Sequence, residues 1–439
     1  MRYTKFVSIL LLCAAAVGCG AGQGAQSKLF PASTPSSNSN NNIAGLTGNN
    51  TSAANSFVNQ SNGNLGANNV SKLNVHSLLY AGATTKIFAH LMLWFGGSSH
   101  MNVGYSSSDA AQIQRQIADM ISRGIDGVVI DWYGPNNAVD QATKAVMHEA
   151  EKHAGFTFAI MIDAGAMGNA CSGCSSQDAL TQLLQYVEKT YFRSPAYFTI
   201  QGQPVVTNFN VDGSVDWQKA NGNLQTPPRF LFQDQGGFEH AMSDGSFSWV
   251  MPTTPNYGLE YLSSFYQTGL SFPRIETMGA TYKGFNDALA GWGSGRAIDQ
   301  QCGQTWLQTF SQINSTYNSG RQLPYLQLVT WNDYEEGTEL ESGIDSCFSL
   351  EASVSGNTLE WTTSGNENTV DHYAVYSSQD GQKLTPLTQT QAGTHSVDLC
   401  SLSLPAGNHS LYVQAVAQPM LANRIPAPVS YTPACGAAH

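Results

Sequence analysis

A group of carboxylates around residue 335 is the part of the sequence best suited to chemistry. The stretch runs Trp331-Asn332-Asp333-Tyr334-Glu335-Glu336-Gly337-Thr338-Glu339-Leu340-Glu341 and follows an apolar run, 325–329, that is typical of a buried strand. Asp333 and Glu336 are three residues apart, and Gly337 permits a sharp bend after them. Two carboxylates beside an aromatic surface can cleave a glycosidic bond, one as acid and the other as base or nucleophile. The alternative is a solvated acidic turn, but the Trp-Asn lead-in and the buried strand favour a site.

The composition is typical of an exported protein that handles an uncharged, hydroxyl-rich ligand. The chain of 439 residues contains 8 Trp and 18 Tyr, whereas charged residues make up only 11% of it. The formal net charge of -12 argues against nucleic acid or an anionic lipid surface as partner, because both need clustered Lys and Arg. We therefore expect a polysaccharide or oligosaccharide ligand, no nucleic acid, no cofactor and a monomeric protein.

Residues 1–19 have the pattern of a secretion signal. Two basic residues precede an apolar run, 6–17, that is too short to span a bilayer. The sequence Ala16-Val17-Gly18-Cys19 resembles a bacterial lipobox, which predicts lipidation of Cys19 and a lipid-anchored location in the bacterial cell envelope or outside the cell. Ala16 stands where Leu is usual, so ordinary signal-peptidase cleavage is the alternative. Residues 20–75 are rich in Ser, Asn and Gly, and we expect them to form a disordered linker.

Six cysteines lie beyond the signal, and an even number in an exported protein favours disulfides. Proximity in the sequence favours the pairs Cys171–Cys174, Cys302–Cys347 and Cys400–Cys435, which is one of fifteen pairings. A zinc site is the alternative for the first pair. It lacks support, because no second CxxC and no HxxxH lies nearby.

Apolar runs alternate with helix-like stretches between residues 78 and 346. Strands are expected at 87–94, 126–132, 156–163, 204–210, 229–233, 247–251, 274–278 and 325–331, and helices at 109–123, 139–153, 177–192 and 302–318. Alternation of this kind implies parallel strands joined by crossover helices, and eight strands predict an α/β fold, a (β/α)8 TIM barrel. A doubly wound open sheet is the alternative, although no glycine-rich nucleotide-binding motif follows a strand.

Residues 347–436 show a different pattern. Short alternating strands are expected at 349–354, 358–362, 373–377, 393–399 and 411–417, with turn residues between them and no helical period. This pattern predicts a small all-β immunoglobulin-like sandwich. Trp361 and the strands 373–376 and 411–416 resemble a fibronectin type III module, which implies a spacer or interaction module.

Polar and aromatic residues follow the expected barrel strands, where barrels place their chemistry. Aromatic faces stack on sugar rings, and amides and carboxylates bond hydroxyls, whereas a phosphate would call for Arg, Lys or a glycine-rich nest. A metal site from Asp131, Asp163 and Asp333 is an alternative without specific ligand spacing, so no metal is expected. Each residue also has a structural alternative, such as a core histidine or a core tryptophan. The candidate substrate-binding residues are His90, Trp94, Asp131, Trp132, Tyr133, Asp163, Asn208, Asp234, Trp331 and Asn332.

The stretch 331–341 closely resembles the WNEWHEGTxIE signature of the endo-α-mannosidase family, glycoside hydrolase family 99. Its Trp-Asn-Asp-Tyr start also resembles the α-1,3-glucanase family, glycoside hydrolase family 71, as does the earlier Phe88-Ala89-His90. The run from Gly124-Ile125-Asp126-Gly127 to Trp132-Tyr133-Gly134 resembles a second family 99 motif. The resemblance covers about residues 86–345. It implies a (β/α)8 barrel that cleaves α-linked mannose or glucose polymers, endo-acting.

The resemblance also implies roles for the carboxylates. Glu336 matches the general acid/base, and Asp333 matches the second catalytic carboxylate. In family 99 that second residue acts on the sugar's own 2-hydroxyl, whereas in family 71 it would activate water. Two departures, Asp333 in place of Glu and Glu335 in place of His, favour the family 71 chemistry. Trp132 and Asp163 match substrate-site positions, with Asp163 in place of a Glu.

The sequence therefore predicts an exported glycoside hydrolase that acts on α-linked polysaccharide of the α-mannan or α-1,3-glucan type. Asp333 and Glu336 are its expected catalytic pair. The alternatives are a non-catalytic surface protein that binds carbohydrate and an adhesin in which the C-terminal sandwich is the working part.

Overall fold

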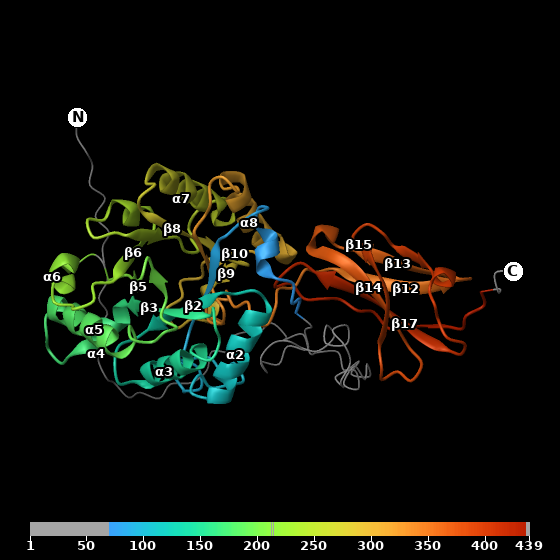
Figure 1. Ribbon diagram of the computed structural model, residues 1–439, viewed down its shortest axis with the longest axis horizontal. Helices are drawn as coiled ribbons and strands as arrows, with labels where there is room; N and C mark the ends of the chain where they lie inside the picture. The colour runs from blue at the N-terminus through green and yellow to red at the C-terminus, as the bar shows by residue number, and fades with distance from the viewer. Residues whose placement is uncertain (1–69, 212, 214, 436–439) are drawn as a thin grey trace, which may run out of the picture. The chain divides into compact units, whose positions relative to one another are not determined.

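The computed structural model describes residues 70–211, 213 and 215–435, and within them eight parallel strands close into a barrel (Figure 1). Pairing of the first strand with the last and of β3 with β5 completes the ring, so the open sheet is excluded. The predicted TIM barrel is confirmed. In ring order the strands are β1 (Lys86–Leu91), β2 (Gly127–Trp132), β3 (Thr157–Asp163), β5 (Gln203–Phe209), β6 (Arg229–Gln233), β7 (Gly245–Phe247), β8 (Glu276–Thr281) and β11 (Tyr325–Leu328).

Helices connect most of these strands on the outside of the ring. The first, α2 (Ala110–Ser122), begins where the side chain of Asp109 accepts a hydrogen bond from the Ala111 N–H, as expected of an N-cap. It buries Ile113, Ile117 and Met120, which recur at helical spacing. The other α-helices are α3 (Ala138–Ala150), α4 (Ala164–Ala170), α5 (Ser176–Thr190), α6 (Trp217–Asn221), α7 (Leu259–Ser271) and α8 (Gln304–Thr316).

Shorter elements fill the connections. Strand β4 (Thr199–Ile200) forms a hairpin with β5, and β9 (Phe285–Asn286) pairs antiparallel with β10 (Ala297–Ile298). The 3-10 turns are η2 (Val75–Leu78), η4 (Gln235–Glu239), η5 (Asn256–Gly258), η6 (Asp287–Leu289), η7 (Gln301–Gly303), η8 (Glu367–Thr369) and η9 (Leu399–Ser401). The region from 211 to 300, in which no helix was expected, contains α6 and α7.

Two antiparallel sheets follow the barrel in the sequence. Strands β12 (Ser349–Ser355), β13 (Thr358–Ser364) and β16 (Ser396–Asp398) form one, and β15 (Thr385–Gln391), β14 (Val370–Ser378), β17 (His409–Ala417) and β18 (Val429–Tyr431) form the other. Both contribute to one apolar core that contains Trp361, Tyr373 and Val413. The expected all-β architecture is therefore present, while the likeness to a fibronectin type III module stays a prediction.

The described part of the chain contains three disulfides, with the pairing that sequence proximity favours. They join Cys171 to Cys174, Cys302 to Cys347 and Cys400 to Cys435. The second links η7, just before α8, to the chain just before β12.

The first part of the segment between β17 and β18, residues 419–422, packs against the barrel. Met420 and Leu421 are fully buried within the barrel's core. The carbonyl of Pro419 accepts a hydrogen bond of 3.0 Å from the indole of Trp306 on α8. Backbone hydrogen bonds also run from Ile344 to Met420 and from Ala422 to Ile344.

Cys19 and the expected signal and linker up to residue 69 lie outside the described residues. The expectation of disorder is wrong for the end of the linker, residues 70–75, because Val70, Ser71 and Val75 are fully buried and Val70 pairs with Ala422. No helix in the described part of the chain has the length and apolar character needed to cross a membrane.

Candidate active site

A cavity of about 80 Å³ lies at the carboxyl ends of the barrel strands. Its lining includes both expected catalytic residues and five of the ten expected substrate-binding residues. Four further residues, Met92, Phe209, Trp249 and Trp292, were not expected. The complete lining is His90, Met92, Trp94, Asp131, Tyr133, Asp163, Phe209, Trp249, Trp292, Asp333 and Glu336.

The loop after β11 turns sharply and brings Asp333 and Glu336 to the same cavity. Oδ1 of Asp333 accepts hydrogen bonds from the backbone N–H groups of Glu335, at 3.0 Å, and Glu336, at 2.9 Å. The Asp333 N–H donates to the hydroxyl of Thr330, and Gly337 follows with a φ of +63°. The turn therefore fixes one oxygen of Asp333 and leaves the other to face the cavity.

Four carboxylates share this cavity, and burial raises the pKa of each of them. For Asp333, which is only 1% exposed, burial and then the charge of Glu336 raise the pKa to about 8. Burial raises the pKa of Asp131 well above its usual range, and the charges of Asp163, Asp333 and Glu336 add to the effect. The pKa values of Asp163 and Glu336 are also raised, mainly by burial. A cavity of this kind holds protons at neutral pH, as acid–base chemistry requires.

His90 forms part of the cavity floor as a neutral imidazole. Burial lowers its pKa to about 3. Its ring meets Trp249 edge-on at 4.7 Å, and its Nδ1 has no hydrogen-bond partner among the described residues. Because the ring stays uncharged, it can donate or accept one hydrogen bond to a ligand without adding charge to the cluster.

Aromatic rings form one wall of the cavity. Trp94 stacks on His100 with 5.0 Å between ring centres, and Tyr133 meets Trp94 edge-on at 5.7 Å. Glu335 holds this wall in place, because its carboxylate lies 2.9 Å from His100 Nδ1 and accepts a 2.9 Å hydrogen bond from the Met101 N–H. Glu335 therefore shapes the loop.

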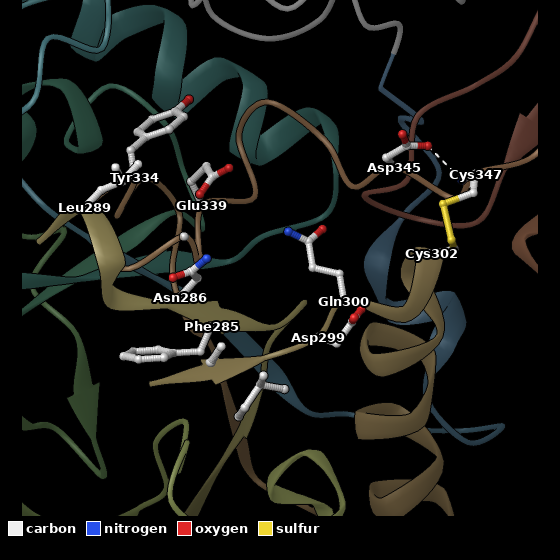
Figure 2. Close-up of a pocket in the computed structure, with 13 residues that line it drawn as sticks. Phe285, Asn286, Leu289, Asp299, Gln300, Cys302, Tyr334, Glu339, Asp345 and Cys347 are labelled. Carbon is white, nitrogen blue, oxygen red and sulfur yellow. Dashed lines mark hydrogen bonds between the residues drawn. A yellow bond between two sulfur atoms is a disulfide. The ribbon is translucent and has the colours of Figure 1, made fainter. Parts of the chain in front are cut away.

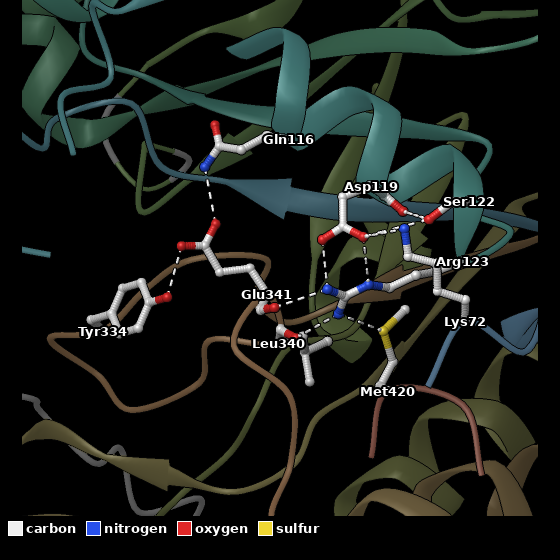
Figure 3. Close-up of polar contacts among 9 residues, drawn as sticks. All are labelled: Lys72, Gln116, Asp119, Ser122, Arg123, Tyr334, Leu340, Glu341 and Met420. Carbon is white, nitrogen blue, oxygen red and sulfur yellow. Dashed lines mark hydrogen bonds and ion pairs between the residues drawn. The ribbon is translucent and has the colours of Figure 1, made fainter. Parts of the chain in front are cut away.

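A buried arginine anchors the end of the loop that carries Asp333 and Glu336 (Figure 3). Arg123, on the C-terminal side of α2, pairs with Asp119 at 2.6 Å and donates to the carbonyls of Leu340 and Glu341 at 3.1 and 2.9 Å. The carboxylate of Glu341 in turn accepts hydrogen bonds from Tyr334 and Gln116. These contacts connect the loop to α2 and limit its freedom to move.

Five expected substrate-binding residues do not line the cavity. Trp132 is fully buried, stacks on Tyr186 and donates to Asp140 at 3.1 Å, so it packs under the helices. Trp331 is also fully buried, with the guanidinium of Arg123 5.0 Å from its ring.

The other three expected residues outside the cavity lining are polar. Two of them are hydrogen-bonded to neighbouring groups, and the third is buried in a barrel strand. Asn332 is fully buried and bonds both backbone groups of Met92. Asp234 accepts a hydrogen bond of 2.5 Å from Tyr261, and Asn208 is buried at 2% exposure in β5.

A larger pocket, about 570 Å³, borders the other side of the catalytic loop (Figure 2). Leu289 and Tyr334 lie at one end and the disulfide Cys302–Cys347 at the other. Several of its polar groups are already bonded within the protein. Glu339, for example, pairs with the buried Lys283 at 2.6 Å. In the described part of the chain, no group of three or more His, Cys, Asp or Glu is arranged to hold a metal ion.

A closed (β/α)8 barrel with paired carboxylates and aromatic walls at its carboxyl end is an arrangement typical of glycoside hydrolases. The chain belongs to glycosyl hydrolase family 71, whose family model matches residues 83–340. It is therefore a glycoside hydrolase. No curated protein matches the chain.

Two solved structures of a GH99 endo-alpha-mannosidase from Bacteroides thetaiotaomicron are similar to the barrel. One, in complex with bis-tris propane, is 18% identical, with 59% of this chain and 87% of that chain covered and a TM-score of 0.48. The other is 16% identical, with coverages of 59% and 88% and a TM-score of 0.46. Both TM-scores lie below 0.5, so the assignment rests on the family match.

Proposed function

We propose that the protein hydrolyses an α-linked polysaccharide of the α-1,3-glucan type at internal linkages. Glu336 is the general acid and Asp333 the general base. The observation that carries the proposal is the presence of both side chains in one buried cavity with aromatic walls. Membership of family 71 and the shorter Asp at position 333 favour glucan over mannan.

The hydrogen-bond donors around the two carboxylates support this division of roles. Asp333 accepts two backbone N–H groups, which stabilise its charged form, whereas Glu336 accepts one N–H, from the indole of Trp292 at 3.2 Å. Burial opposes the ionisation of Asp333 most strongly, and the negative charge of Glu336 comes second. Protonation of Glu336 removes this second effect. In the reactive form the pair carries one proton, on Glu336, while Asp333 is ionised, and the raised pKa of Asp333 means that this form becomes more populated as pH rises towards about 8.

The reaction follows from these states. Glu336 gives its proton to the glycosidic oxygen as the bond from that oxygen to the anomeric carbon breaks. Asp333 takes a proton from the water that attacks this carbon from the opposite face. One water is consumed, and the product has the inverted anomeric configuration. Asp131, with a raised pKa and an Oδ1 without a described partner, donates its own proton to a sugar hydroxyl, while Trp94, Tyr133, Asp163 and His90 contact the ring.

The test is hydrolysis of α-1,3-glucan and α-mannan by Glu336→Gln and Asp333→Asn variants, with the product anomer followed by NMR. We expect a loss of about 100-fold or more on the substrate that the native enzyme cleaves, with folding intact. Glu351, an exposed residue of β12, supplies the matched control Glu351→Gln, which should keep full activity. Full activity of Glu336→Gln, or a retained anomeric configuration, would contradict the proposed roles.

The location and modules of the chain are also proposals. We propose that the signal is cleaved immediately before Cys19, that lipid on Cys19 anchors the protein, and that residues 20–69 form a tether. The catalytic module would span 78–346 and a fibronectin type III-like spacer 347–436. Mass spectrometry of the exported protein tests the anchor, because a Cys19→Ala variant should lose the acyl mass and leave the membrane fraction.

A further inference from the structure

The loop between β9 and β10 is shaped by Asp287 and Gly293, and its shape does not depend on the exposed side chain of Trp292. Asp287, fully buried, accepts hydrogen bonds from the backbone N–H groups of Ser294 and Arg296, at 3.1 and 2.8 Å, and from Nε of Arg296 at 2.8 Å. A Cβ atom at Gly293 would lie 1.8 Å from the carbonyl oxygen of Asp287, so only glycine fits there. The loop is therefore built on Asp287 and Gly293.

Trp292 lies at the tip of this loop and is 52% exposed. Its indole Nε1 donates a 3.2 Å hydrogen bond to Oε1 of Glu336. Its ring lies edge-on to Trp94 at 6.2 Å and to His100 at 6.3 Å. Packing in a hydrophobic core does not explain an aromatic side chain that is this exposed. One edge of the Trp292 ring instead contacts the carboxylate of Glu336, and about half of the side chain is open to solvent.

We infer that Trp292 is a substrate-positioning residue, whose indole stacks on the sugar unit on the leaving-group side and holds Glu336 in the orientation for proton transfer. This inference rests on the proposed function. A cavity of about 80 Å³ is smaller than pockets that enclose small molecules, about 300–1,000 Å³, so the neighbouring sugar must lie at its mouth. Glu336 protonates the oxygen of the departing sugar, which therefore leaves on the side of Glu336 and Trp292.

A pair of substrates separates this role from a structural one. An α-1,3-glucan oligosaccharide has a leaving-group sugar that needs both the stacking surface and the proton. The α-glucosyl fluoride has neither a leaving-group sugar nor a strong need for protonation. We expect Trp292→Ala to lower kcat/KM about 30- to 100-fold on the oligosaccharide and less than about 3-fold on the fluoride. Trp292→Phe, which keeps an aromatic face, should recover part of the KM effect.

The pH profile gives a second measurement. Charged groups that face Glu336 are Asp333 and Glu335 on its own loop, Asp131 on β2, and Asp287 and Arg296 on the Trp292 loop. The indole N–H lowers the pKa of Glu336, so its removal in Trp292→Phe raises that pKa further. We expect the alkaline limb of kcat/KM on the oligosaccharide to move to higher pH.

Leu289→Ala is the matched control, because Leu289 is 71% exposed on the same loop and does not line the catalytic cavity. It should leave both substrates unaffected. An equal loss on both substrates with Trp292→Ala, no loss on the oligosaccharide, or an unmoved alkaline limb in Trp292→Phe would overturn the inference. If Glu336→Gln is inactive while Trp292→Ala is fully active, only this inference fails. If Glu336→Gln is fully active, the proposed function fails.

Discussion

Replacing Asp333 with Asn should make the protein more stable at alkaline pH while abolishing its activity. Asn is nearly the same shape as Asp, and its Oδ1 can still accept the two backbone N–H groups that hold the Asp333 side chain. The change therefore removes the buried charge and keeps the turn. A native pKa above the unfolded value means that ionisation favours unfolding, so the native carboxylate destabilises the fold as pH rises.

The magnitude follows from the pKa. The pKa of Asp333 rises from its ordinary 3.8 to about 8. This difference of about 4 corresponds to an upper limit of about 6 kcal/mol, at about 1.4 kcal/mol for each pKa unit. Because Asp131, Asp163 and Glu336 share the protons of the cavity, we expect about 2–3 kcal/mol in practice. The gain should be small at pH 4, which is close to the pKa of the unfolded carboxyl, and should grow up to about pH 8, the pKa of the native carboxyl.

Urea unfolding at pH 4, 6, 7.5 and 9, followed by circular dichroism, measures this difference in the free energy of unfolding. The control Glu351→Gln changes an exposed carboxylate and should follow the native protein at every pH. A gain for Asp333→Asn that is the same at pH 4 as at pH 9, or a loss of stability at pH 9, would refute the reasoning.

Three further predictions concern the supports of the site. Replacing Arg123 with Met should lower the free energy of unfolding by about 3–5 kcal/mol in urea, because the buried Asp119 loses its guanidinium partner and is left with the 3.8 Å ion pair with Lys72, and adding Asp119→Leu should recover part of the loss. Glu335→Gln should raise KM about 3- to 10-fold with little change in kcat, because the His100 wall is held less firmly; a large loss of kcat would instead give Glu335 a chemical role. Trp132→Phe should cost about 1–2 kcal/mol of stability and leave kcat/KM within about 3-fold, because its indole hydrogen bond is structural; a large kinetic effect would return Trp132 to the site.

The sequence predicts the barrel and the turn after its last strand well, because both depend on local patterns. The apolar runs of a parallel barrel are buried on both faces and stand out against their polar ends. The expected strand at 229–233 matches β6, and most others differ from the structure by a few residues. The turn after β11 depends on Asp333 and Gly337, which are adjacent enough in sequence to be recognised together.

Trp132 and Asn208 lie outside the cavity lining for the same physical reason. Successive side chains of a strand point to opposite faces, so neighbouring residues at a strand end cannot both face the cavity. In β2, Asp131 lines the cavity, and Trp132 therefore packs outward under Tyr186. The resemblance of Trp132 to a substrate-site position of the family does not tell on which face of β2 its side chain lies.

Trp292 was not recognised from the sequence, for a different reason. It lies between two glycines in a loop with no hydrophobic period, so no pattern marks it as part of the site. A single large aromatic residue flanked by Gly291 and Gly293 was the one available signal. Its contact with Glu336 joins residues 44 positions apart and appears only in the folded chain.

The segment from Pro419 to Ala422 has a consequence for how this gene can be cut and rearranged. It comes from beyond residue 347, yet it fills part of the barrel's core and bonds Trp306, Ile344 and Arg123. A fragment that stops at residue 346 would lack these partners and leave an apolar hole beside the anchor of the catalytic loop. The enzyme therefore cannot be shortened to its barrel by a single cut, and recombination that moves the barrel to a new gene has to carry both modules together.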